Sequence, residues 1–99
     1  SEKIPAFSPQ EPLANIPNPF NPETDIVYEV TEIGKVVLNV FSTKGKKVIE
    51  LVNGNKDAGL HRVHWNGKDS RGKDMPSGVY YAVLEVNGKR FTKKMIMLK

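Results

Sequence analysis

Oxygen-bearing side chains crowd residues 66–74, and a loop of this kind could hold a calcium ion. Asn66, Asp69, Ser70 and Asp74 stand there beside Gly72, and calcium takes oxygen ligands at alternate positions, closed by a bidentate carboxylate. Lysine and arginine side chains interleave with these acids, and no glutamate closes the set. Because Asn, Asp and Gly are also the residues that turns require, we interpret the stretch as a structural loop. We expect no metal ion and no other cofactor.

Two histidines and one serine are the remaining candidates for catalysis. His61 and His64 are three residues apart, so on a strand they point to opposite faces and do not hold one ion together. We expect His61 on the inner side and His64 at the surface. The chain has no cysteine, and Ser77-Gly78 ahead of a strand is typical of a turn rather than of a hydrolase nucleophile elbow. The sequence predicts a protein that is not an enzyme.

Basic side chains gather toward the C-terminus, where they could bind nucleic acid. The net charge is +4, with one base and six acids in residues 1–34 but 14 bases and five acids in residues 35–99. Lys93 and Lys94 are adjacent and point to opposite faces of a strand, and no stacking triplet or phosphate loop accompanies them. Lysines on a terminal strand also guard against edge-to-edge aggregation. We therefore expect no nucleic-acid partner and interpret the two halves as complementary parts of one fold.

The elements that carry these residues are predicted to be strands. Apolar side chains alternate with period two over residues 26–31, 36–41 and 60–65, which is typical of half-buried strands. Residues 78–86 form the longest apolar strand. Asn87-Gly88 predicts a tight hairpin to a last strand over residues 89–98. A further strand is expected over residues 47–52, with a polar loop over 53–59 and a turn-rich connection over 66–77. The expected core consists of Ile26, Tyr28, Val36, Leu38, Val40, Val63, Trp65, Tyr80, Leu84 and Met95.

Proline sets the first part of the chain apart from the rest. Six of the seven prolines fall in residues 1–22, where the missing N–H argues against helix or central strand. We expect residues 1–12 to be a linker from an upstream domain and residues 13–99 to be a single domain. Ile16 and Phe20 are expected to turn inward along a sheet edge. The longest apolar run has six residues, too few for a membrane span, so we expect no membrane insertion.

Five blocks, in order, resemble the C-terminal sorting domain of the type IX (Por) secretion system. They cover residues 16–28, 36–48, 58–69, 72–81 and 93–99. The motif residues of the first four blocks are Pro19, Phe20, Asn21, Pro22, Gly45, Gly59, Trp65, Gly67, Gly72, Ser77, Gly78 and Tyr80. The basic-then-apolar ending is formed by Lys93, Lys94, Met95, Ile96, Met97, Leu98 and Lys99.

This resemblance implies an all-β fold, an immunoglobulin-like antiparallel β-sandwich of about seven strands, that serves as a non-catalytic secretion signal. In that family the domain follows a cargo in the same chain, and the outer-membrane translocon recognises it after export to the periplasm. A surface sortase-like peptidase then removes it. Recognition is implied for Lys93 to Lys99 and removal for residues 1–11. We expect a monomer that is secreted or carried to the surface of a Gram-negative bacterium.

The sequence departs from the family pattern at two positions, and two other functions are alternatives to the sorting signal. Ser42 and Asn66 stand where the second and third blocks often have an aspartate, and both fit turns. The same blocks resemble the Ig-like domain of the flagellar hook-capping protein, a structural interaction module. The end of the chain directly after the apolar last strand favours the sorting interpretation. A cell-surface carbohydrate-binding module is the other alternative, and it requires an exposed row of aromatic side chains.

Overall fold

The computed structural model describes residues 12–99, which form seven β-strands and no helix. The expectation of a linker over residues 1–11 lies outside the described residues. Pro12 belongs to the folded part, because its carbonyl accepts a hydrogen bond of 2.9 Å from the amide of Glu29. The strands are β1 (Leu13–Ile16), β2 (Thr24–Val30), β3 (Gly34–Ser42), β4 (Lys47–Lys56), β5 (Gly59–Trp65), β6 (Gly78–Val86) and β7 (Lys89–Met97).

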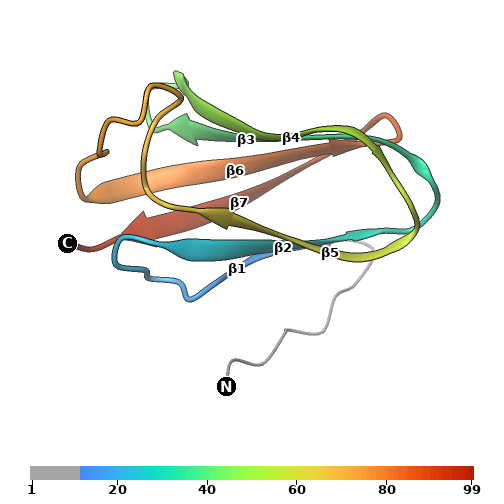
Figure 1. Cartoon of the computed structure of the whole chain (residues 1–99), viewed down its shortest axis with the longest axis horizontal. Helices are drawn as coiled ribbons and strands as arrows, with labels where there is room; N and C mark the ends of the chain where they lie inside the picture. The colour runs from blue at the N-terminus through green and yellow to red at the C-terminus, as the bar shows by residue number, and fades with distance from the viewer. Residues whose placement is uncertain (1–11) are drawn as a thin grey trace.

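Two antiparallel sheets pack face to face to form a sandwich (Figure 1). One sheet has the order β1-β2-β5, and the other has the order β4-β3-β6-β7. The first segment joins both sheets: β1 pairs with β2, and Phe20 then forms a parallel bridge with Met97 at the end of β7. Within residues 12–99 no helix is long and apolar enough to span a membrane.

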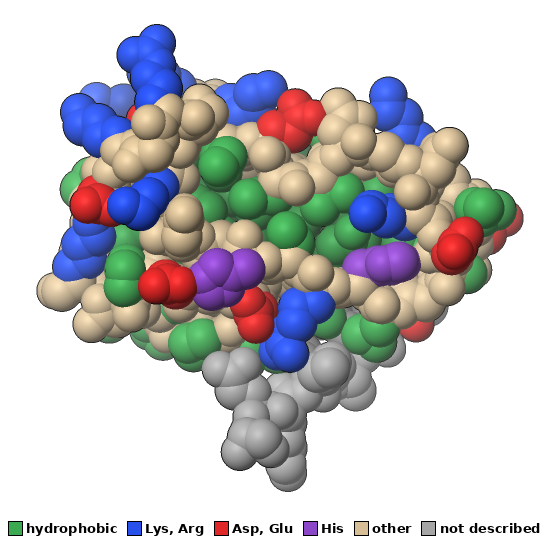
Figure 2. All heavy atoms as spheres, in the orientation of Figure 1, with side chains coloured by type: hydrophobic (Ala, Val, Ile, Leu, Met, Phe, Trp, Pro, Cys, Tyr) green, Lys and Arg blue, Asp and Glu red, His purple; other side chains and the backbone are tan. Residues whose placement is uncertain are grey.

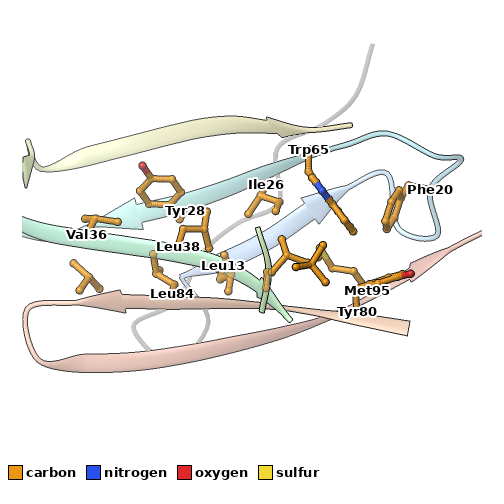
Figure 3. Close-up of a cluster of buried hydrophobic side chains, with 14 of the residues drawn as sticks. Leu13, Phe20, Ile26, Tyr28, Val36, Leu38, Trp65, Tyr80, Leu84 and Met95 are labelled. Carbon is orange, nitrogen blue, oxygen red and sulfur yellow. The ribbon is translucent and has the colours of Figure 1, made fainter. Parts of the chain in front are cut away.

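The core lies between the sheets and is filled by the inward-facing side chains that the alternation predicts. Ile26 and Tyr28 of β2 face Leu38 of β3 and Leu84 of β6 across the interior (Figure 3), and each is no more than 2% exposed. Val63 is the one expected core residue that is only half-buried. It lies on β5, an edge strand whose outer side is covered by no further strand among the described residues.

Two expectations about the strands need correction. In β1 the buried side chains are Leu13 and Asn15, whereas Ile16 is only half-buried. Phe20 does turn inward and is 2% exposed. Strand β4 continues to Lys56 instead of giving way to a loop after Val52. The reason is that β3 begins at Gly34, so its first residues still offer a backbone partner, and Asn53 and Gly54 complete the ladder despite their preference for turns.

The hairpin between β6 and β7 is confirmed. Asn87 and Gly88 have φ values of 50° and 77°, the left-handed conformation that a two-residue turn of this type needs. The side-chain Nδ2 of Asn87 also donates to the carbonyl oxygen of Glu32 at 3.1 Å. This bond ties the hairpin to the turn between β2 and β3.

Candidate interaction site at the end of the last strand

Most of the motif residues lie at one end of the sandwich (Figure 1). We call this end the C-terminal pole; it consists of the turns over residues 17–23, 43–46 and 66–77 together with the adjoining residues 65, 78–80 and 94–99. Gly59 is the exception, because it begins β5 and pairs with Val30 at the opposite end. The motif residues at the pole are Pro19, Phe20, Asn21, Pro22, Gly45, Trp65, Gly67, Gly72, Ser77, Gly78 and Tyr80.

Three aromatic rings from three blocks pack together beneath the pole (Figure 3). The Trp65 ring lies 5.6 Å from that of Phe20 and 5.4 Å from that of Tyr80, with tilted and edge-on geometries. Such arrangements are favourable for aromatic pairs. The Tyr80 hydroxyl donates to the Pro76 carbonyl oxygen at 2.6 Å, and burial raises the pKa of that hydroxyl above its usual value. The rings therefore fix the first turn, β5 and β6 relative to one another.

The loop over residues 66–77 is held against this cluster by backbone bonds. The indole N–H of Trp65 donates to the Lys68 carbonyl oxygen at 2.9 Å, and the Met75 amide donates to the Gly67 carbonyl oxygen at 2.9 Å. Gly67 has a φ of +76°, and a Cβ there would lie 2.7 Å from the Pro22 carbonyl oxygen. Only a glycine permits this close approach between the first and third blocks.

Three of the four side chains that could hold calcium make contacts within this loop instead. The Asp69 carboxylate accepts hydrogen bonds from the amides of Lys73 and Arg71, each at 2.9 Å. The Lys73 amide is the main cause that lowers the pKa of Asp69. Asn66 accepts from the Lys68 amide at 3.1 Å, and Asp74 forms an ion pair of 3.2 Å with the Lys68 ammonium group. Among residues 12–99, no three His, Asp or Glu side chains are grouped as metal ligands.

The resemblance assigns recognition to residues 93–99, and some of these side chains are buried while others are exposed. Met95 and Met97 are fully buried in the core, and Lys93 and Ile96 are half-buried. Lys94, Leu98 and Lys99 are exposed, Leu98 by 54%. In the folded chain only the exposed members and the edge of Ile96 can contact a partner.

The two histidines lie along β5 at the surface (Figure 2). His61 stacks on Tyr28 with 5.3 Å between ring centroids, and its Nε2 lies 2.8 Å from the Asp57 carbonyl oxygen. His64 is exposed as predicted, but its ring lies between two carboxylates: Nδ1 is 2.8 Å from Asp25 Oδ1 and Nε2 is 2.5 Å from Glu23 Oε1.

Sequence reasoning did not find this His64 cluster. The register between β2 and β5 places Asp25 opposite His64, and Arg62 completes the group with a 3.2 Å contact from its Nε to Asp25. The acids at Glu23 and Asp25, two residues apart before a strand, were the available signal. The hydrogen bonds to Asp25 and then to Glu23 raise the pKa of His64 above 6.5. The contact between acidic β2 and basic β5 agrees with the prediction that the two charge halves are complementary.

The raised pKa of His64 makes the stability of the domain depend on pH. Since that pKa is higher in the folded chain than in the unfolded chain, the protonated ring stabilises the fold fully below about pH 6.5. The contribution is lost as the pH rises through the folded-state pKa. Because the side chain is 54% exposed, we expect only about 0–1 kcal/mol. His64→Gln should remove this part of the pH dependence, as measured by chemical denaturation from about pH 5 to pH 8.

The control for this prediction is His61→Gln, since His61 stacks on Tyr28 and its Nε2 lies beside the backbone carbonyl oxygen of Asp57. This variant should keep the pH dependence of the wild-type chain. A His64→Gln variant with the wild-type profile would contradict the assignment of the pH dependence to His64.

Comparisons with known proteins agree with this architecture. The sequence profile of the FlgD Ig-like domain matches residues 25–89. No curated protein matches the chain. Among solved structures, the chain is similar to dimeric latent PorU from Porphyromonas gingivalis, with a TM-score of 0.69 at 18% identity over 87% of this chain and 9% of PorU. It is also similar to FlgD from P. aeruginosa, with a TM-score of 0.56 at 29% identity over 75% of this chain and 59% of FlgD.

The chain thus spans a small part of PorU and less than two thirds of FlgD. The likeness to PorU establishes the fold, and the expected Ig-like sandwich is confirmed. The family profile covers well over half of the chain, which also confirms the relation to the hook-capping domain. The chain belongs to the FlgD Ig-like domain family.

Proposed function

We propose that this domain is a non-catalytic sorting signal that directs an attached protein through a type IX outer-membrane translocon to the cell surface. The observation that carries the proposal is the convergence of three separated sequence blocks on the end of β7. Phe20, Trp65 and Tyr80 pack in one cluster, and Phe20 pairs with Met97. The blocks that resemble the sorting family therefore form one unit around the segment to which recognition is assigned.

The proposal includes the route and the partners that the resemblance implies. The attached protein precedes this domain in the same chain, crosses the periplasm and is released or retained at the surface of a Gram-negative bacterium. The translocon and a surface sortase-like peptidase are the proposed partners, and the domain acts as a monomer without nucleic acid, metal or membrane insertion. The fold shared with PorU is compatible with this role.

A structural interaction module of the hook-cap type is the second candidate. It is favoured by the family match over residues 25–89 and by the 29% identity to FlgD. A carbohydrate platform is disfavoured, because the exposed large apolar side chains among residues 12–99 are Ile33, Leu60 and Leu98, none of them aromatic. The two remaining candidates differ in one respect: only the sorting signal depends on a translocon.

The test is a reporter with a periplasmic export leader, fused upstream of residues 1–99. We expect it on the surface of a host with a type IX system and in the periplasm of the same host without the translocon. Surface labelling of intact cells measures the difference. Equal surface reporter in both hosts contradicts the sorting role and favours the interaction module. Deletion of residues 93–99 is a poor variant for this test, because it removes the fully buried Met95 and Met97 and unfolds the domain.

A further inference from the structure

The outer edge of β7 is occupied by the chain's own proline-rich segment. The Phe20 amide donates to the Ile96 carbonyl oxygen at 2.9 Å, and the Leu98 amide donates to the Phe20 carbonyl oxygen at 2.8 Å. Phe20 thus acts as a one-residue parallel strand beside Met97. We call residues 18–20 the strap.

The side chain of Asn18 extends this pairing by imitating a peptide group. Its Nδ2 donates to the Lys94 carbonyl oxygen at 3.1 Å, and its Oδ1 accepts from the Ile96 amide at 3.0 Å. One amide side chain therefore satisfies a backbone acceptor and a backbone donor on the same edge. From the Lys94 carbonyl to the Leu98 amide, the outward groups of the last strand all have partners in the strap.

A partner could recognise the last strand either by adding a strand to its edge or by contacting its folded surface, and the closed edge decides between these two modes. A partner that adds a strand needs free backbone groups along an edge, and those of residues 94–98 are taken. To free them, Phe20 would have to leave the core, where it is 2% exposed and lies 5.6 Å from the Trp65 ring. Removing a buried phenylalanine from its contacts costs about 3–5 kcal/mol. Recognition of the folded surface without displacement of the strap is therefore favoured.

That surface combines residues from both ends of the described chain. Asn18 and Pro19 are exposed on the strap, directly beside the exposed Lys94 and Leu98 of the C-terminal segment. Lys99 follows, and its amide is fixed by the Ser77 hydroxyl at 3.0 Å. The set offers apolar contact from Pro19 and Leu98, carries two cations and contains no acid. A complementary partner presents an apolar patch bordered by carboxylates.

We propose that the translocon component reads this composite surface, formed by Asn18, Pro19, Lys94, Leu98 and Lys99, through an apolar protein patch bordered by carboxylates. The inference rests on the proposed sorting function and changes its site: the last strand alone is not the signal. The strap of the first block and the last strand are read together, because the strap both covers the edge and supplies part of the contact.

The test compares two asparagines of the domain in the reporter fused to residues 1–99. Asn18→Ala removes both bonds to the β7 edge, whereas Asn55 is an exposed residue of β4 that pairs with Lys35 at the opposite end of the sandwich. In a host with a type IX system, Asn18→Ala should reduce surface reporter several-fold, and Asn55→Ala should leave it unchanged. Thermal unfolding of both purified domains should remain cooperative.

A second pair of variants tests the same proposal if Asn18→Ala does not fold. Asn18→Asp keeps the acceptor for the Ile96 amide and adds a carboxylate to the surface, so it should also reduce export because it repels an acidic partner. Asn55→Asp is its matched control. If both Asn18 variants show surface reporter at or above the wild-type level, the composite surface is overturned. That result would show that the strap contributes nothing to recognition or obstructs the edge of β7.

Two further outcomes distinguish the composite surface from the proposed sorting function and from binding to an anionic membrane. A wild-type fusion that stays in the periplasm contradicts the proposed function itself, whereas wild-type export with unaffected Asn18 variants contradicts only the composite surface. The purified domain could instead bind phosphatidylglycerol vesicles and lose this binding in Lys94→Gln, while the export of Asn18→Asp is unaffected. These two results together would overturn the protein partner and assign the surface to an anionic membrane.

Discussion

Trp65→Ala is expected to lower the free energy of unfolding by about 3–5 kcal/mol. The indole is fully buried, contacts the rings of Phe20 and Tyr80 and donates to the Lys68 carbonyl oxygen. The substitution leaves a large cavity and an unsatisfied loop carbonyl at the point where three sequence blocks meet. Because small domains have total stabilities of about 5–15 kcal/mol, this change alone removes a large share. Urea denaturation monitored by far-UV circular dichroism measures it.

The matched control is Leu60→Ala on the same strand. Leu60 is 49% exposed, so its truncation should cost no more than about 0.5 kcal/mol. A Trp65→Ala variant whose stability is close to that of Leu60→Ala would show that the indole does not hold the pole together. It would also reopen the carbohydrate-binding alternative, which requires exposed aromatic side chains.

Gly67→Ala is expected to be the second most damaging change, at about 2–5 kcal/mol. The new Cβ would lie 2.7 Å from the Pro22 carbonyl oxygen and 3.2 Å from the Met97 side chain, and the φ of +76° disfavours any L-residue. Backbone strain and steric overlap therefore add. The loss of unfolding free energy is measured from the shift of the denaturation midpoint, with a check that the slope of the transition stays constant.

Gly72→Ala separates these two contributions. Gly72 has nearly the same φ, +83°, but no atom lies within 4 Å of its would-be Cβ. Only the backbone strain remains there, about 1–2 kcal/mol. Equal losses for Gly67→Ala and Gly72→Ala would contradict the close approach between the first and third blocks.

Local patterns in the sequence predicted the greater part of the fold. Alternation located β2, β3 and β5 because each has one face in the core, and the side-chain period of a strand is two. The long apolar run located β6. Asn87-Gly88 located the last hairpin because few residues accept its backbone conformation. These features depend on neighbours in the chain, so a single sequence is enough to find them.

The features that escaped prediction depend on pairing between distant residues. Turn-forming Asn53 and Gly54 remain in β4 because β3 supplies their partners. The bond from Asn18 to Lys94 spans 76 residues, and the contacts of His64 with Asp25 and Glu23 span 39 and 41 residues. No local rule relates such positions. The sequence predicted that Phe20 of the strap turns inward along a sheet edge, but only the fold shows that this edge is that of β7.

The assignment of recognition to residues 93–99 stays a prediction, but the structure shows which of these side chains are accessible. Met95 and Met97 are buried in the core. Sequence alternation had already placed Met95 in the expected core, and Met97 lies on the same inward face of the last strand. The contribution of Asn18 and Pro19 could not have been predicted, because it requires the strap to lie beside β7.

The most direct test of this account is surface display of the reporter with two matched triple substitutions in a host with a type IX system. One triple, Lys94→Glu with Leu98→Asp and Lys99→Glu, alters exposed side chains at the C-terminal pole. The other, Lys35→Glu with Ile33→Asp and Lys89→Glu, makes the same changes at exposed positions of the opposite end. We predict that the first remains in the periplasm with its fold intact while the second reaches the surface. Equal surface display of both would contradict the claim that the C-terminal pole is the sorting signal.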